Sequence, residues 1–185
     1  MSGLRAGGRS QNKRTEGTMI PHIKKVLYAT DLSKNSSYAF FYAVDLAKKH
    51  DAKVVILHAV EPVPAYATLY GDVTYQIERD WQQEATDNVR KLLQNFCQKV
   101  EGQIGPPCAA LVSNIIVKVG HPVEEILNTA ESEGCDLIVL GNHGKGFLKQ
   151  TFLGSVSRRV LDRARKPVFI IPLPSEKSGV DWDGL

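Results

Sequence analysis

The fold is decided by the stretch Asp136-Leu-Ile-Val-Leu-Gly-Asn-His-Gly-Lys-Gly-Phe-Leu-Lys-Gln-Thr-Phe-Leu-Gly-Ser-Val-Ser157. It begins with an apolar run, 137–140, which predicts a buried β-strand. The glycines that follow are Gly141, Gly144, Gly146 and Gly154, and a helix is expected to begin at Ser155. Glycines let backbone N–H groups approach an anion, and a helix N-terminus offers unpaired donors. The stretch therefore predicts a strand, a phosphate-binding loop and a helix in succession.

Strand and helix patterns alternate along the rest of the chain. The segments expected to form strands are 23–30, 53–60, 109–119, 136–141 and 168–171, the third with an irregularity near Ser113 and Asn114. The segments expected to form helices are one that begins after the N-cap Ser33 and ends near His50, then 76–100, 122–132 and 155–164. This alternation predicts an α/β fold: a single doubly wound, Rossmann-like domain with a five-stranded parallel sheet.

Charge and composition divide the chain into three parts. Residues 1–18 hold four basic side chains and one acidic side chain, which accounts for the net charge of +3, and we expect a disordered basic tail there. The domain is expected over 19–174, followed by a polar tail over 175–185. The body after the first tail holds 19 basic and 19 acidic residues, so it lacks the positive surface that nucleic acids require.

The cysteines and the hydropathy pattern bear on the compartment. Cys97, Cys108 and Cys135 form no CxxC pair, so we expect reduced thiols rather than disulfides or a zinc site. No apolar run approaches the roughly 20 residues that span a bilayer, and the polar N-terminus does not resemble a secretory signal. These features predict a cytoplasmic protein with no membrane contact.

Three candidate ligand positions fall at the ends of predicted strands: 29–31, 58–60 and the loop after Gly141. In open parallel sheets, ligands bind outside the carboxyl ends of the strands, where the strand order reverses. The loop matches neither the P-loop GxxxxGK[ST] nor the dinucleotide GxGxxG pattern. Its own spacing is Gly141-x2-Gly144-x9-Gly154-Ser155.

This spacing after an Asp-Leu-Ile-Val-Leu strand resembles the universal stress protein family, in its UspA-like, ATP-binding branch. The other segments that carry the resemblance are Val26–Ser33, Val55–Val60, Gly120–Ile126 and Lys166–Ile171, in the family's order. The resemblance covers about residues 22 to 173. It implies ATP as ligand, with Mg²⁺ or Mn²⁺ held mainly by the phosphates, and a homodimer formed through the fifth strand.

The resemblance also implies which residues contact the nucleotide. Those expected to hold the phosphates are Gly141, Gly144, Gly154 and Ser155, flanked by Asn142, His143 and Val156. Leu140 and Ser157 complete the predicted loop set. Asp31, beside Thr30, is expected to face the ribose or a phosphate-bound metal. Ala59 is expected to line the adenine pocket through its backbone, and Ala29 stands where the family often carries Pro or Val.

Catalytic residues are harder to identify. The spacings indicate no Ser-His-Asp or Cys-His pairing, and we expect His143 to be exposed in its loop and His58 to be a satisfied core residue. We therefore expect an ATP-binding regulatory protein in the stress response. The alternatives are a slow ATP hydrolase or an enzyme that phosphorylates its own Ser155 or Ser157, and a dimerising interaction module in which nucleotide is incidental.

Overall fold

The computed structural model describes residues 20–61, 80, 83–84, 86–92, 94–95, 98, 108–143 and 153–172. The strands are β1 Lys25–Thr30, β2 Lys53–Val60, β3 Val112–Val119, β4 Leu137–Gly141 and β5 Val168–Ile171. The helices are α1 Lys34–His50, α3 Cys108–Leu111, α4 Pro122–Ser132 and α5 Ser155–Arg163. The predicted tails lie outside the described residues, and so do 76–79 and several later residues of the predicted helix 76–100, whose described residues are helical.

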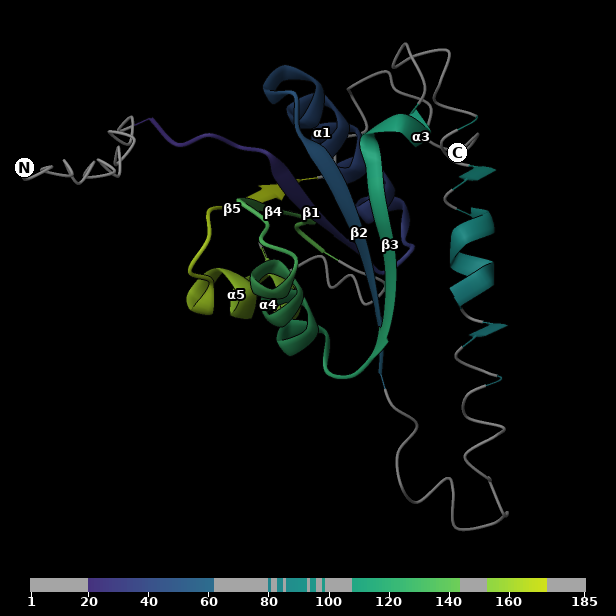
Figure 1. The fold of residues 1–185 in the computed structure, drawn as a ribbon. Helices are drawn as coiled ribbons and strands as arrows, with labels where there is room; N and C mark the ends of the chain where they lie inside the picture. The colour runs from purple at the N-terminus through teal and green to yellow at the C-terminus, as the bar shows by residue number, and fades with distance from the viewer. Residues whose placement is uncertain are drawn as a thin grey trace, which may run out of the picture.

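The five strands form one parallel sheet in the order β3-β2-β1-β4-β5 (Figure 1). The chain moves from β1 outward to β3, then returns to the other side of β1 to form β4 and β5. The strand order therefore reverses between β1 and β4, which is the position where such sheets bind ligands. The predicted fold class is confirmed, and β5 lies at a sheet edge as expected.

Helices cover both faces of the sheet (Figure 1). One buried cluster joins alternate strand residues such as Tyr28 and Ile56 to Phe40 and Val44 of α1. The other joins the intervening strand residues to Val123 and Ile126 of α4 and Val160 of α5. Because successive side chains of a strand point to opposite faces, the almost continuous apolar runs of the central strands supply both clusters.

Local signals in the sequence set the helix boundaries. The hydroxyl of Ser33 accepts from the backbone N–H of Ser36, which confirms Ser33 as the N-cap of α1. Pro122 occupies the first turn of α4, where its missing N–H costs nothing. The turn after α4 contains Gly134 at a φ of 63°, a left-handed conformation that glycine adopts without strain.

The third strand departs from the prediction at its start. Residues 109–111 belong to the short helix α3, and the strand begins only at Val112. A short apolar run fits a helical turn and a strand equally well, so the sequence pattern was ambiguous here. The predicted irregularity is confirmed, because Val54 pairs with Val112 while Val55 pairs with Asn114, leaving Ser113 as a bulge.

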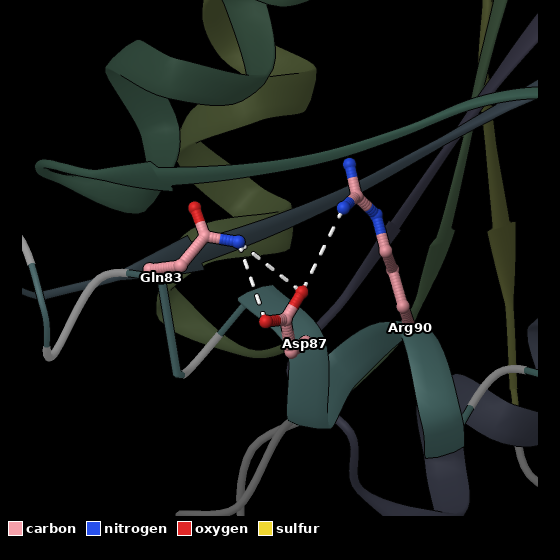
Figure 2. Close-up of polar contacts among 3 residues, drawn as sticks. All are labelled: Gln83, Asp87 and Arg90. Atoms are coloured by element: carbon pink, nitrogen blue, oxygen red, sulfur yellow. Dashed lines mark hydrogen bonds and ion pairs between the residues drawn. The ribbon is translucent and has the colours of Figure 1, made fainter.

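Polar contacts on the helices lie mainly at the surface. In the helical residues between 80 and 98, the Asp87 carboxylate accepts from Gln83 at 3.2 Å and lies 3.8 Å from Arg90 (Figure 2). Arg163 of α5 forms a bidentate ion pair with Glu124 of α4, and this hydrogen bonding lowers the pKa of the Glu124 carboxyl. Among the described residues, no helix is both long and apolar enough to cross a membrane.

Candidate functional site

The candidate site lies at the carboxyl ends of β1 and β4, where the strand order reverses. Asp31 follows β1 directly, and Asn142 follows β4. β1 and β4 are neighbours, paired from Val26 with Leu137 to Tyr28 with Val139. The structure therefore brings the predicted acidic turn and the start of the predicted phosphate loop to the same edge of the sheet.

A close backbone contact joins the end of β4 to the start of α5. The N–H of Gly154 donates to the carbonyl oxygen of Asn142 at 2.7 Å. A Cβ placed on Gly154 would lie 3.0 Å from that oxygen and 3.4 Å from the Cα of His143. The φ of Gly154 is −64°, so any residue accommodates this backbone conformation. The glycine is required here for space rather than for conformational freedom.

Two further hydrogen bonds fix the end of β4. The Ser157 hydroxyl donates to the carbonyl oxygen of Gly141 at 2.8 Å, and the N–H of Asn142 donates to the carbonyl oxygen of Ile171 at 2.9 Å. Ser157 is buried, so its bond lies within the fold. The β4 end is thereby held between α5 and β5, and the first turn of α5 has a defined position beside it.

The first turn of α5 presents different environments to its three residues. Ser155 is exposed, Val156 is half-buried and Ser157 is buried. The N-cap of the helix is Gly154, which has no side chain to satisfy the first backbone N–H groups. A helix N-terminus without a side-chain cap is suited to an anionic ligand, because the dipole and the unpaired N–H groups both favour negative charge.

The turn after β1 holds Asp31 by local hydrogen bonds. Asp31 Oδ1 accepts from the backbone N–H of Ser33 at 3.1 Å and from the Ser33 hydroxyl at 2.6 Å. Between them, Leu32 adopts a φ of 63°, which is uncommon for a residue other than glycine. Such backbone strain is found at functional sites where surrounding contacts enforce it.

Contacts from Thr30 stabilise this strained turn. Thr30 Oγ1 accepts from the N–H of Leu32 at 3.0 Å and donates to the Ser36 hydroxyl at 2.9 Å. The Tyr28 hydroxyl donates to the Ser36 carbonyl oxygen at 2.6 Å, and burial raises the pKa of the Tyr28 phenol. A protonated, buried donor at Tyr28 therefore anchors the start of α1 beneath the turn.

The predicted adenine-side residues share one face of the sheet. Ala29 and Leu140 are buried in the cluster that contacts α4 and α5. Ala59 alternates with Val55 and Leu57 of the same cluster, so it projects to the same face. The structure thus places these residues on the face from which α5 approaches, and it leaves Ala59 on β2, the strand next to β1.

The loop residues after β4 differ from expectation in one respect. His143 is only 8% exposed, so the prediction of an exposed loop histidine is wrong. Its backbone lies close to Gly154, whose Cβ, if present, would be 3.4 Å from the His143 Cα. Asn142 Oδ1 is buried without a hydrogen-bond partner among the described residues. The predicted phosphate residue Gly144 lies outside the described residues, as do Lys145 and Lys149.

Sequence reasoning missed one contact at this edge. His58 was expected to be a core residue, but it is half-buried at the end of β2, and its Nδ1 lies 2.8 Å from the carbonyl oxygen of Thr30. The signal that identifies it is its place next to Ala59 at a strand end. Among the described residues, no three His, Cys, Asp or Glu side chains gather as a metal site would require.

Comparison with known proteins agrees with this geometry. The model of the universal stress protein family matches residues 22–172. Universal stress protein MJ0577 of Methanocaldococcus jannaschii is 30% identical over 158 residues, covering 80% of this chain and 94% of that protein. Universal stress protein YxiE of Bacillus subtilis is 35% identical over 153 residues, covering 80% and 99% respectively.

Solved structures show the same fold. The structure of MJ0577 matches with a TM-score of 0.66 at 27% identity, covering 84% of this chain and all of that one. A universal stress protein in complex with cAMP matches with a TM-score of 0.51 at 24% identity, covering 83% of this chain and 100% of that one. At that lower identity the likeness concerns the fold.

Proposed function

Because the chain belongs to the universal stress protein family, we propose that it is a regulatory module of the stress response that binds ATP between the ends of β1 and β4. The observation that carries the proposal is the backbone contact of Gly154 with Asn142. It seats the N-terminus of α5, which has no side-chain cap, beside the end of β4. One protein of this fold holds cAMP, so the fold accommodates an adenine nucleotide.

The residues at the edge fit such a ligand. Gly154 lets the start of α5 lie against the backbone of Asn142, and Asn142 Oδ1 is a buried acceptor that lacks a donor among the described residues. Leaving a buried acceptor unpaired costs about 1–3 kcal/mol, so a ligand that supplies a donor gains that energy. Both features support a polar ligand at this position.

The proposal assigns roles to the residues of the edge. Gly141, Gly154 and the exposed Ser155 would hold the phosphates, since they lie at the β4 end and at the first turn of α5. Asp31, oriented by Ser33, would face the ribose or a phosphate-bound metal. The remaining predicted contacts are Ala29, Thr30, Ala59, Leu140, Asn142, His143, Gly144, Val156 and Ser157.

The metal in this proposal is Mg²⁺ or Mn²⁺ carried mainly by the phosphates. Asp31 is a carboxylate at the end of β1, and one carboxylate together with phosphate oxygens is a usual Mg²⁺ environment. The N-terminus of α5 would accept the negative charge of the phosphates. The apolar face near Ala29 and Ala59 would accept the adenine ring. We place the protein in the cytoplasm, where a buried free thiol such as Cys135 stays reduced.

Titration calorimetry tests the binding proposal. The purified 185-residue chain, stripped of ligand by denaturation and refolding, should bind ATP with Mg²⁺ at micromolar to submillimolar concentration. Mass spectrometry of the ligand released from freshly purified protein would identify the nucleotide that the chain carries. If no heat of binding appears at millimolar ATP, ADP, AMP or cAMP, the proposal is wrong.

The proposal includes a homodimer that forms through the edge strand β5. Phe169 of β5 is 45% exposed, and Leu161 of α5 is also exposed. An apolar edge strand with free backbone groups favours pairing with a second chain. Light scattering at micromolar concentration should give twice the mass of the 20.4 kDa chain.

Phosphoryl transfer to the protein itself has one acceptor that the structure favours. Ser155 is exposed at the start of α5, whereas the Ser157 hydroxyl is buried and donates to Gly141. Incubation with γ-labelled ATP should therefore label Ser155 rather than Ser157 if slow autophosphorylation occurs. Turnover above about one per minute, lost on replacing Asp31, would favour an enzyme over a binding module.

A further inference from the structure

His58 donates a hydrogen bond across the sheet to the end of β1. Its Nδ1 lies 2.8 Å from the carbonyl oxygen of Thr30, and Thr30 is its register partner. A carbonyl oxygen only accepts, so Nδ1 carries the proton.

The pairing of β1 with β2 directs the Thr30 carbonyl at β2, and the His58 contact reinforces this orientation of the peptide unit that precedes the site. A trans peptide is planar, with its C=O and N–H pointing in opposite directions. Because β2 and β4 flank β1, the Thr30 carbonyl directed at β2 turns the N–H of Asp31 toward β4. The sheet itself shows this alternation: Lys24 O accepts from Lys53 at the start of β2, and Lys25 O accepts from Asp136 just before β4.

The same peptide unit begins the strained turn. The Leu32 N–H bonds to Thr30 Oγ1, and Leu32 holds a φ of 63°. A contact that adds to the hold on the Thr30 carbonyl therefore also steadies the start of the turn that presents Asp31. His58 supplies this contact from a neighbouring strand, whereas the bonds of Ser33 and Ser36 come from the turn and from α1.

The position of the His58 imidazole at the end of an apolar run in β2 favours a role in hydrogen bonding over a role in packing. The residues before it on β2, Val54 to Leu57, are fully buried and apolar. An apolar residue at position 58 would continue that pattern without the cost of desolvating an imidazole. The ring appears at the carboxyl edge of the strand, beside Ala59, where the ligand is proposed to lie.

We propose that His58 is a positioning residue, which holds the Thr30–Asp31 peptide unit so that Asp31 is preorganised for the nucleotide. The inference rests on the proposed function for its consequence in binding. The orientation of the peptide is a property of the nucleotide-free protein and is tested separately. His58 itself does not need to touch the ligand.

Variants at position 58 separate this role from a packing role. In His58→Asn the amide nitrogen takes the place of Nδ1, so a donor remains for the Thr30 carbonyl. In His58→Gln the nitrogen takes the more distant Nε2 place, and His58→Leu carries no donor. We expect ATP affinity to fall about fivefold in the Gln and Leu variants, as the loss of one hydrogen bond predicts, and to stay within about twofold of the parent in the Asn variant.

A matched control removes a similar contact at the opposite edge of the sheet. The Ser113 hydroxyl donates to the carbonyl oxygen of Val54 at 3.3 Å, near the starts of β3 and β2. Ser113→Ala should leave ATP affinity unchanged. If it weakens binding as much as His58→Gln does, general loosening of the sheet explains the effect and the inference is wrong.

Amide hydrogen exchange tests the positioning without a ligand. The N–H groups of Leu32 and Ser33 are bonded within the turn, so they should exchange several-fold faster in His58→Gln and His58→Leu than in the parent and in His58→Asn. Should the Leu variant fail to fold, the comparison of Asn with Gln still decides. The inference is wrong if the Leu32 and Ser33 amides exchange at the parent rate in His58→Gln. It is also wrong if they exchange as fast in His58→Asn as in His58→Gln. If the parent binds no nucleotide, the proposed function fails, while exchange still decides whether His58 positions the turn.

Discussion

Gly154 and Asn142 are in direct backbone contact: the N–H of Gly154 donates to the carbonyl oxygen of Asn142 at 2.7 Å. The contact closes the loop that leaves β4 and returns to α5. It leaves no room for a side chain on Gly154, and it places the first turn of α5 at the point where the strand order reverses. The phosphate half of the proposed site depends on this approach.

Gly154→Val should abolish ATP binding. The new Cβ would lie 3.0 Å from a backbone oxygen, which cannot move aside as a flexible side chain can, so α5 must shift away from β4. Titration calorimetry measures the loss. The control is Gly134→Ala, which introduces strain at a φ of 63° in open space, away from the site. It should lower the free energy of unfolding by about 1 kcal/mol and leave ATP affinity unchanged.

Ser157→Ala and Ser155→Ala should have opposite consequences. Ser157 donates to Gly141 from a buried position, so its replacement should lower the free energy of unfolding by about 1 kcal/mol. Ser155 is exposed, so its replacement should leave stability within about 0.5 kcal/mol and weaken ATP binding. Urea denaturation and calorimetry on both variants check this. Equal effects of the two variants on both quantities would contradict the roles assigned.

Thr129→Val should stabilise the protein. The Thr129 side chain is fully buried in α4, and its hydroxyl has no hydrogen-bond partner among the described residues. Valine has the same shape without the desolvated hydroxyl, so the free energy of unfolding should rise by about 1 kcal/mol. Thr129→Ala, which leaves a void instead, should lower it. A loss of stability with valine would show that the hydroxyl is satisfied in solution.

Phe169→Lys should convert the proposed dimer to a monomer. The side chain is 45% exposed on the edge strand β5, and a lysine there opposes edge-to-edge pairing. Light scattering gives the mass directly. Leu92→Lys is the control, because Leu92 is 49% exposed on a helical segment away from β5. Dimer mass retained in the Phe169 variant, or lost in the Leu92 variant, would place the interface elsewhere.

Cys135 should be unreactive in the folded protein at pH 8. Burial raises the pKa of its thiol to about 11, so the nucleophilic thiolate is scarce until the chain unfolds. Because the folded pKa exceeds the unfolded value, this group's contribution to stability is present below about pH 9 and is lost as the pH rises toward about 11. In a chain with Cys97 and Cys108 replaced by Ser, thiol labelling during urea unfolding measures this. Rapid labelling without urea would contradict the burial.

The order and type of most elements could be predicted from residue patterns. The continuous apolar runs predict the parallel strands, and the signals at Ser33, Pro122 and Gly134 mark helix boundaries that the structure confirms. The start of the third strand was wrong at 109–111, because a short apolar run does not distinguish a helical turn from a strand.

Some features of the candidate site could likewise be predicted from the sequence, and others could not. The glycine spacing and Asp31 follow from the sequence, because they depend on residue type at strand ends. The burial of His143 and the contact of His58 with Thr30 do not, since they depend on tertiary packing and on the register of β2 against β1. A single sequence does not record which residues of two strands lie opposite each other.

The sequence by itself determined the alternation of strands and helices and the glycine stretch that leads from β4 into α5, because local periodicity and residue size encode both. Only the tertiary structure decided that β1 and β4 are neighbours, which brings the turn at Asp31 and the backbone of Asn142 to adjacent strand ends. The physical reason is that strand order and register arise from burying both faces of the sheet at once, an energy that no segment holds alone.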